Sequence, residues 1–549
     1  MALALAVILL LAGCTAGEAP PELALINGRI MTVGKAIPRA EAFLVRDRRF
    51  SAVGSNAEIL SLAGDETEVL DLEGKTVTPG FIDAHLHPIP IFPETSRVSY
   101  VELGPESVRT IDELIEALSR KAESTSAGEW VFGFGYQDTK LGRHPTRVDL
   151  DRVSTEHPIM ILHSSGHIRV FNSRVFVQAG ITRDTPDPPG GGFDRDDMNV
   201  PNGVCREAAV DLVLERGPDL PEPGPIEAAK GMRRAFERYL EKGITSVGDA
   251  LVDPARLLLY KVIVGRTVPV RVYAMVEEAH FRKLEWMGLR TGSGDEHLRV
   301  GAVKVFHGNS LSGRTAWLYE PYADRPDYYG VPPDRSQEEL DDLIFEIHAA
   351  GFQAAVHSNG DREIDMVLDA FEKALKRLPR EDHRHRIEHA SIVNSSILER
   401  VKRLGVILSL HSYVYEHGDK MEAYGEHRFG MMHANRSALD LGIPVAGSSD
   451  SPVSAADPML RIQSLVTRRS AEGKVYGPEQ RIGVEEAIRV FTLGAAYASF
   501  EESIKGSIEP GKLADFVVLS ADPTRVPLEG IKDITVEKTF IGGQCVYAR

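Results

Sequence analysis

Short apolar segments alternate with amphipathic ones through the middle of the chain, and this alternation predicts parallel βα units. A capping box at Ser336–Glu339 predicts the start of one helix, and helical spacing of apolar residues predicts two more at 361–378 and 395–404. Eight strands, each followed by a helix or loop, predict an α/β fold of the (β/α)8, or TIM-barrel, type. The strand candidates are 78–84, 243–249, 268–276, 298–306, 351–357, 385–389, 405–410 and 444–448.

Both ends of the chain carry a different pattern, in which alternating apolar residues are interrupted by turn signals such as Asn27-Gly28. Neither end is long enough to bury a good core alone, so we expect one small composite β-sandwich; two separate β appendages are the alternative. Residues 22–79 would form its first part, and 481–549 the final barrel helix and its second part. Residues 80–480 would form the barrel domain, with a large insertion at about 88–242 over the barrel mouth.

The first 21 residues are predicted to be a leader and tether outside the fold. Residues 2–13 are apolar, too few to span a bilayer (about 20 are needed) but suited to a signal-peptide core. The run Leu11-Ala12-Gly13-Cys14 resembles the lipobox of bacterial lipoproteins, in which the Cys is lipidated. This predicts an exported lipoprotein held to the cell envelope through Cys14. Because a positive n-region is missing, a plain cleaved signal or a cytoplasmic enzyme stays open.

Composition and charge narrow the class of protein further. The 549 residues are 43% hydrophobic and 26% charged, which is ordinary globular composition. The formal net charge is −17, and no basic run suited to phosphate binding is present, so a nucleic-acid partner is not expected. A small molecule is the expected partner, and the oligomeric state, including a homo-oligomer, is left open.

Candidate chemistry lies at the predicted strand ends. Six polar residues fall at or near the C-terminal ends of five strands: His85, His87, Lys304, His357, His389 and Asp450. In a TIM barrel such residues converge on one site, and His85 and His87 project from the same side of their strand. Each alone would more often be a hydrogen-bonded core residue, a turn cap or a snorkelling lysine. Together they predict a metal site.

This ordered set resembles the metal centre of the amidohydrolase superfamily, and the chain is similar to amidohydrolase family 3, which includes N-substituted formamide deformylase-like proteins. The resemblance extends to residues 78–87, 165–167, 172–173, 314–316 and 506–515.

The resemblance implies two metal positions. His85, His87 and Asp450 would hold the more buried metal. His357 and His389 would hold the outer one, with Lys304 carboxylated on its amine and bridging the two. A one-metal site with unmodified Lys304 stays open. Four imidazoles and a carboxylate favour Zn2+, although Mn, Fe or Co would also fit.

The implied reaction is hydrolysis of a non-peptide C–N bond in an amide, N-substituted formamide or cyclic amide by metal-activated water. Asp450 would act as the base and pass the proton to the leaving nitrogen. An ester is accessible to the same chemistry. A deaminase on this scaffold is an alternative, but it usually needs a Glu near the fifth strand, and Ser358-Asn359-Gly360-Asp361 follow His357 instead. A surface lipoprotein that only binds a ligand is a third reading.

The predicted barrel mouth supplies candidates for substrate binding: His167, His307, Arg314, Trp317 and His411. His307 and His411 stand where the chain departs from the commoner family pattern, and either could bind substrate or metal; we favour a polar lining.

The sequence also predicts roles for three other residues near these motifs. His163 and Tyr322 are further candidates for the pocket wall. Glu388, next to His389, is expected on the opposite face of its strand as a packing or salt-bridge partner.

Overall fold

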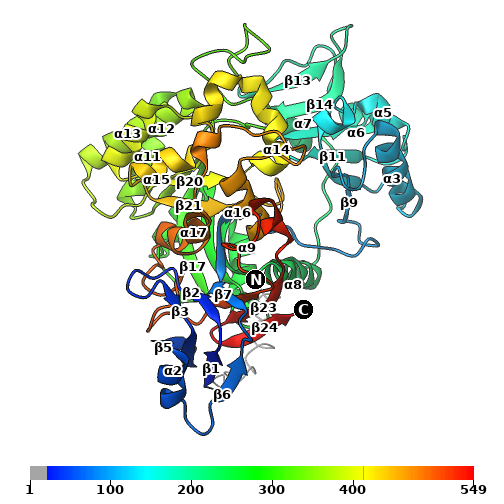
Figure 1. The fold of residues 1–549 in the computed structure, drawn as a ribbon. Coiled ribbons are helices and arrows are strands. Elements are labelled where there is room, and N and C mark those ends of the chain that lie inside the picture. The colour runs from blue at the N-terminus through cyan, green and yellow to red at the C-terminus, as the bar shows by residue number, and fades with distance from the viewer. Residues whose placement is uncertain (1–21, 412) are drawn as a thin grey trace.

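The computed structural model describes residues 22–411 and 413–549. At its centre, eight parallel strands form a nearly closed barrel (Figure 1). All eight predicted strands are present, with ends that differ from the predicted ones by at most three residues, and the predicted (β/α)8 fold is confirmed. The barrel strands are β8 (Phe81–Leu86), β15 (Ile244–Val252), β16 (Arg271–Glu277), β17 (Leu298–Phe306), β18 (Ala354–Ser358), β19 (Arg386–His389), β20 (Ile407–His411) and β21 (Val445–Ser448).

Strands β21 and β8 stand at the two ends of the sheet order, and hydrogen bonds join the end of β8 to the segment that follows β21. The backbone N–H of Asp450 donates to the carbonyl oxygen of His85 at 2.9 Å, and that of His87 donates to Ser451 at 2.7 Å. The buried Asp83 carboxylate accepts a bond from the Ser449 N–H at 3.0 Å. These bonds bring the carboxyl ends of the first and last strands together.

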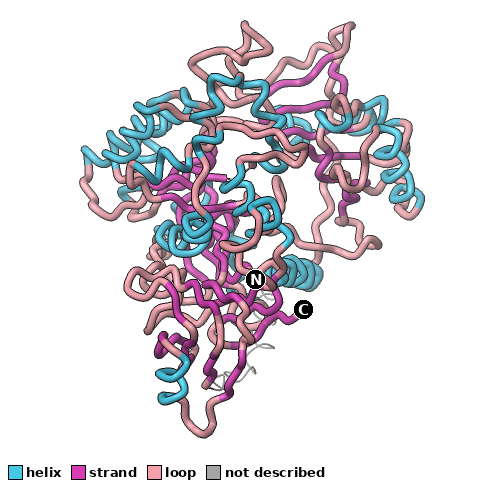
Figure 2. The backbone as a smooth tube through the Cα atoms, viewed as in Figure 1, coloured by secondary structure: helices cyan, strands magenta, loops and turns pink. Residues whose placement is uncertain are grey.

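Helices surround the strands (Figure 2). They bury their apolar faces against the strands. The predicted capping box is present: Ser336 and Glu339 bond each other's backbone at the start of α11. In α12, Ile364, Val367 and Phe371 recur at helical spacing and are buried. The main helices of this layer are α8 (Pro225–Glu241), α9 (Pro254–Ile263), α10 (Phe281–Trp286), α11 (Gln337–Ala349), α12 (Asp361–Arg377), α13 (Ser395–Leu404), α14 (Val414–Met421), α15 (Asn435–Asp440), α16 (Pro458–Thr467), α17 (Val484–Arg489) and α18 (Ala495–Ala498).

The two chain ends build one pair of sheets, as predicted. Strand β7 (Thr76–Pro79) pairs antiparallel with β22 (Phe516–Leu519), which joins the N- and C-terminal segments in one six-stranded sheet. Rings of Phe43, Phe50 and Phe516, from both ends of the chain, pack with centroids 4.9–6.1 Å apart. The other strands of this pair are β1 (Leu23–Ile26), β2 (Arg29–Met31), β3 (Arg39–Ala40), β4 (Ala42–Arg46), β5 (Arg49–Gly54), β6 (Glu68–Asp71), β23 (Val536–Ile541) and β24 (Gln544–Ala548), with α2 (Asn56–Leu62) beside them.

The segment between β8 and β15 forms a layer of its own, at the upper right of Figure 1. Its six-stranded sheet buries one face under α3 (Ile111–Glu123) and α5 (Arg147–Asp151) and the other under α6 (Ser173–Gln178) and α7 (Ala208–Arg216). Its strands, in sheet order, are β13 (Gly191–Arg195), β14 (Pro201–Glu207), β12 (Ile168–Phe171), β11 (Ile159–His163), β10 (Val131–Tyr136) and β9 (Tyr100–Glu102).

A buried ion pair ties this layer to the barrel helices. Lys420 of α14 donates to the Asp138 carboxylate at 2.8 Å, and the ring of His163 lies 3.1 Å from the same carboxylate. Because the Lys420 side chain is almost fully buried, this contact fixes the position of the layer.

The predicted leader, including Cys14, lies outside the described residues. Among the helices that the structure does describe, none combines the length and the apolar composition that a membrane crossing requires.

Candidate metal centre

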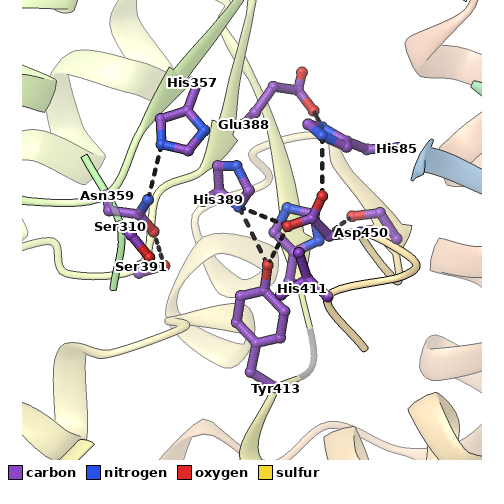
Figure 3. A network of polar contacts seen from close by, with 12 residues as sticks. His85, Ser310, His357, Asn359, Glu388, His389, Ser391, His411, Tyr413 and Asp450 are labelled. Atoms are coloured by element: carbon purple, nitrogen blue, oxygen red, sulfur yellow. Dashed lines mark hydrogen bonds and ion pairs between the residues drawn. The ribbon is translucent and has the colours of Figure 1, made fainter. Parts of the chain in front are cut away.

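The predicted ligands come together where the barrel strands end, and Figure 3 shows four of them: His85, His357, His389 and Asp450. His85, Lys304, His357 and His389 are buried residues of β8, β17, β18 and β19, while His87 and Asp450 follow β8 and β21. All six residues are linked by short contacts within one cluster, described below. These residues are far apart in the sequence but lie close together in space, because the C-terminal ends of parallel strands meet at one edge of the barrel.

The first group of candidate ligands is His85, His87 and Asp450. Their ligand atoms all lie within 4.8 Å of one another. The Asp450 Oδ1 atom is 3.4 Å from Nε2 of His85 and 3.3 Å from Nε2 of His87. Lys304 Nζ lies 3.4 Å from the same His85 nitrogen. Two imidazole nitrogens and a carboxylate are a donor set that fits a divalent transition metal.

Glu388 orients the first of these histidines. Its carboxylate lies 2.5 Å from Nδ1 of His85 and also bonds the guanidinium of Arg386. A carboxylate on the remote nitrogen fixes the ring and makes the other nitrogen a better ligand. The expected salt bridge is present, but the expectation that Glu388 faces away from the site is wrong. His389 and Ala390 have positive φ angles, 74° and 41°. The strand therefore ends in a turn, and the side chains of both Glu388 and His389 reach the barrel interior.

A second group contains His389, His411 and the same Asp450, with ligand atoms again within 4.8 Å of one another. The two imidazole rings have centroids 4.3 Å apart. Nδ1 of His411 lies 2.9 Å from the Ser448 hydroxyl, while Nε2 of His411 and of His389 are buried without a hydrogen-bond partner among the described residues. Buried unpaired nitrogens are costly unless something binds them, so both rings are suited to hold a ligand.

His357 lies next to this second group, with its ring centroid 4.3 Å from that of His389. Its Nε2 is 3.2 Å from two polar groups, the carbonyl oxygen of Asn309 and the side-chain amide nitrogen of Asn359. These contacts orient the His357 ring beside the second group.

Burial sets the charge states of these groups. It lowers the pKa of His85, His357 and His389 well below the ordinary value, so the imidazoles are neutral, as ligands must be. It lowers the pKa of Lys304 to about 8. Burial alone would raise the pKa of Asp450, but the hydrogen bond with His87 and the neighbouring imidazoles hold it well below its usual range.

Tyr413 is a site residue that the sequence analysis missed. Its hydroxyl donates to Oδ2 of Asp450 at 2.6 Å, so the two carboxylate oxygens have separate partners. Burial and the charge of Asp450 raise the pKa of Tyr413 well above its ordinary value, which keeps the hydroxyl protonated. The sequence did contain an indication of this role, because Tyr413 is two residues beyond His411, in the segment that departs from the family pattern.

A cavity of about 530 Å³ opens onto the cluster. The barrel contributes His87, His357, His389 and Asp450 to its lining, and the opposite wall comes from the layer between β8 and β15. His167 belongs to that wall, and its ring centroid is 5.2 Å from that of His357.

Glu207 fixes the orientation of His167. Nδ1 of His167 lies 2.6 Å from the Glu207 carboxylate, and although burial alone would lower the pKa of His167, the charge of Glu207 raises it above the ordinary value.

Other predicted wall residues lie outside this lining. Arg314 pairs with Asp324, and Trp317 stacks against the Arg362 guanidinium at 3.8 Å. His307 is buried, and neither of its ring nitrogens has a partner among the described residues. The two further wall candidates, His163 and Tyr322, are also buried and hydrogen-bonded within the protein. The structure thus brings His167 to the cavity and His411 to the ligand cluster, but not His307, Arg314 or Trp317 to the lining.

Comparisons with known proteins agree with this geometry. A model of the amidohydrolase family matches residues 68–547. The chain is 31% identical over 540 residues to the putative amidohydrolase YtcJ of Bacillus subtilis, covering 95% of this chain and 99% of that protein. It is 30% identical over 549 residues to N-substituted formamide deformylase of Arthrobacter pascens, and the match covers 96% of this chain and 98% of that protein. A solved structure of an uncharacterized metal-dependent hydrolase from Pyrococcus horikoshii matches with a TM-score of 0.72 at 28% identity, covering 92% of this chain and 99% of that one.

A parallel eight-stranded barrel that gathers histidines and an aspartate at its carboxyl ends defines a metal-dependent hydrolase of the amidohydrolase superfamily. Within that superfamily, the chain belongs to the amidohydrolase family, whose model spans nearly all of the described residues. The family resemblance predicted from the sequence is confirmed.

Proposed function

We propose that this protein hydrolyses a non-peptide C–N bond in a small-molecule amide, N-substituted formamide or cyclic amide. Water breaks the bond: the carbonyl carbon gains the hydroxyl group, and the leaving nitrogen gains the proton. The observation that carries the proposal is the placement of the His85, His87 and Asp450 ligand atoms within 4.8 Å of one another beside a cavity of small-molecule size. The similarity to a formamide deformylase supports formamides among the candidates.

A divalent metal held by these side chains would supply a water that ionises near neutral pH and would polarise the scissile carbonyl. Asp450 is anionic and its Oδ1 faces both histidines, so we assign it the removal of the water proton and its delivery to the leaving nitrogen. Tyr413 donates to the other carboxylate oxygen and holds Asp450 in this orientation.

The proposed ligands form two groups that share Asp450. A second ion between His389 and His411 would satisfy the two buried Nε2 atoms, and His357 lies beside it. Zn2+ suits this donor set. Lys304, if carboxylated, would become an anion with two oxygen ligands, and mass spectrometry of the intact protein would then find the added mass of one carbon dioxide.

Metal content tests the ligand assignment. We expect the purified full-length protein to hold between about one and two transition-metal ions per chain. His411→Gln should lower that content, whereas His163→Gln, which changes a buried histidine outside the cluster, should leave it unchanged. Protein that cannot be loaded with any metal would contradict the proposal.

Substrate screening tests the reaction. Metal-loaded protein should hydrolyse at least one class among N-substituted formamides, N-acyl amino acids and cyclic amides, and each cleavage should form one free amino group, which for a cyclic amide stays in the ring-opened product. Loss of that activity with a chelator and its return with Zn2+ would support a metal-dependent reaction. An inactive metal-loaded protein across all three classes would contradict it.

We also propose, from the sequence alone, that Cys14 anchors the protein to the cell envelope. Cys14→Ser should then move the protein from the membrane fraction to the soluble fraction, and an unchanged distribution would contradict the anchor.

A further inference from the structure

A second cavity of about 520 Å³ adjoins the first. It lies between strands β9–β11 and helix α8. The two cavities share five lining residues: His87, Ile89, Phe134, Leu162 and Pro452. Large apolar side chains line the second cavity and remain substantially exposed, with Ile89 at 41% and Tyr100 at 44%. Exposed apolar surface in a concave site is typical of a surface that binds an apolar group.

Arg169 lies beside the shared wall of the two cavities. It belongs to β12, lines the first cavity, and pairs in register with Leu162 of β11, which lines both. It also follows His167, which directly precedes β12, by two residues, a separation of at most about 7 Å. Because the His167 ring lies 5.2 Å from His357, the Arg169 position is within the length of a small molecule from the candidate metal centre.

Arg169 is half-buried, and its guanidinium has no carboxylate partner among the described residues. Its Nε atom is buried without a hydrogen-bond partner among the described residues, and its Nη1 faces the Met160 sulfur at 3.8 Å. Burial lowers the pKa of Arg169, because the charged form is poorly solvated there. Tyr100 of β9 and, more weakly, Asp211 of α7 are near enough to favour the charged form, but Arg169 and Asp211 form no ion pair within 4.0 Å.

The two other arginines that line the first cavity differ from Arg169 in this respect. Arg256 lies 3.5 Å from the Asp249 carboxylate, and Arg335 is paired with Glu278. Arg169 is thus the cavity's arginine without a carboxylate partner among the described residues. A planar guanidinium presents a fork of N–H donors that matches a carboxylate, and a buried one gains most from such a partner.

We propose that Arg169 binds a carboxylate of the substrate and that the second cavity accommodates an apolar substituent next to it. The inference rests on the proposed amide hydrolysis and narrows its substrate to N-formyl or N-acyl derivatives of amino acids with a large apolar side chain. The scissile carbonyl would lie at the candidate metal centre, the carboxylate at Arg169, and the apolar side chain against Phe134, Leu162 and Tyr100. Hydrolysis would release the free amino acid and the carboxylic acid of the acyl group.

Matched substrates test the charge requirement. With metal-loaded wild type, N-formylphenylalanine should be cleaved with a kcat/KM at least about tenfold higher than its neutral analogue N-formylphenylalaninamide, a difference of about 1.4 kcal/mol. Arg169→Met should remove this preference by raising KM for the acid, with little change for the amide. Arg169→Lys should keep part of it. Arg238→Met, which removes an exposed cation from the rim of the second cavity, serves as the control and should leave the preference unchanged.

Substrates with side chains of different size test whether the second cavity binds the apolar substituent, and this test uses only the wild-type protein. Wild type should cleave N-formylglycine at least about tenfold less efficiently than N-formylphenylalanine, because the smaller substrate leaves the apolar wall uncovered.

The outcomes separate the two proposals. Equal cleavage of the acid and the amide, or cleavage of other amides but of neither probe, would overturn the inference and leave the proposed function standing. Failure to cleave any amide would overturn the proposed function itself.

Discussion

Asp450 is the residue on which the two groups of candidate ligands meet. Oδ1 faces His85 and His87, Oδ2 accepts a bond from Tyr413, and His389 lies 4.0 Å away. The residue sits just beyond β21 with a φ of 57°, a left-handed conformation that turns the chain at the barrel edge. One side chain therefore has both a structural and a chemical role.

Asp450→Asn tests the chemical role. The amide cannot accept the water proton, so we expect kcat to fall by about 100-fold to 10,000-fold while much of the metal content is retained. Steady-state kinetics and elemental analysis of the same preparation measure the two effects. Full activity in the variant would dismiss Asp450 as the base.

Tyr413→Phe tests whether the hydroxyl positions Asp450. Removing one hydrogen bond to a charged group costs about 1.5–3 kcal/mol. We therefore expect kcat to fall by about tenfold or more, with KM changed little. Tyr424→Phe is the matched control, because it removes another buried hydroxyl, one that donates to the Leu311 carbonyl. An equal fall in kcat for both variants would point to a general effect on the fold.

At the scale of elements, a chain of neutral histidines connects helix α11 to the start of β19. The Ala354 N–H donates to Nδ1 of His385, which places the His385 proton on Nε2, facing Nδ1 of His348 at 2.9 Å. His348 in turn donates from Nε2 to the Leu378 carbonyl at 2.7 Å. Every donor in the chain has an acceptor only while both rings are neutral.

This chain predicts a pH dependence of stability. Burial lowers the pKa of His385 and His348 below the ordinary value, so the folded state binds fewer protons than the unfolded state. The stabilisation is complete above the ordinary pKa of about 6.5 and is lost as the pH falls below it.

Urea unfolding at about pH 7.5 and about pH 5 measures this effect. His348→Leu should lower the free energy of unfolding at the higher pH by about 1–3 kcal/mol and should lose less on acidification than wild type. His427→Leu changes an exposed histidine and should keep the wild-type pH difference. The same difference in all three proteins would refute the role of the chain.

Strand positions explain which elements and ligands the sequence could predict. Apolar periodicity located all eight barrel strands, and the strand ends located the six candidate ligands. The alternation of side chains along a strand predicted the wrong face for Glu388, because no local sequence pattern indicates the left-handed backbone at His389. The ring of His411 could be placed at the mouth but not in the cluster, since its position depends on packing against His389 and on Ser448 from another strand.

At the scale of the whole molecule, one buried ion pair joins the barrel base to the C-terminal segment. Arg271 of β16 donates to both oxygens of Asp515, at 2.6 and 2.9 Å, and Asp515 also accepts the Gly542 N–H at 2.8 Å. Burial alone would raise the pKa of Asp515, but Arg271 lowers it, so the carboxylate stays charged. This contact could not be predicted from sequence, because its partners are far apart in the chain and only the folded barrel brings them together.

Asp515→Asn should therefore destabilise the protein by about 3–5 kcal/mol, because it leaves Arg271 buried without its counter-charge. Glu485→Gln breaks an exposed pair with Arg39, which also links two distant segments, and should cost less than about 1 kcal/mol. Chemical denaturation of both variants gives the comparison. Similar losses would show that burial does not decide the strength of these links.

The cavity has two walls of different origin. The barrel supplies the candidate ligands from its strand ends, whereas the facing wall comes from a sheet with two apolar cores of its own, held in place by Lys420 and Asp138. A substitution on β10–β12 can therefore alter which molecules fit without disturbing the groups that react. Because residues of this layer line the cavity without belonging to the ligand cluster, we expect that exchanging residues 88–242 between relatives would change substrate preference and keep the candidate ligands.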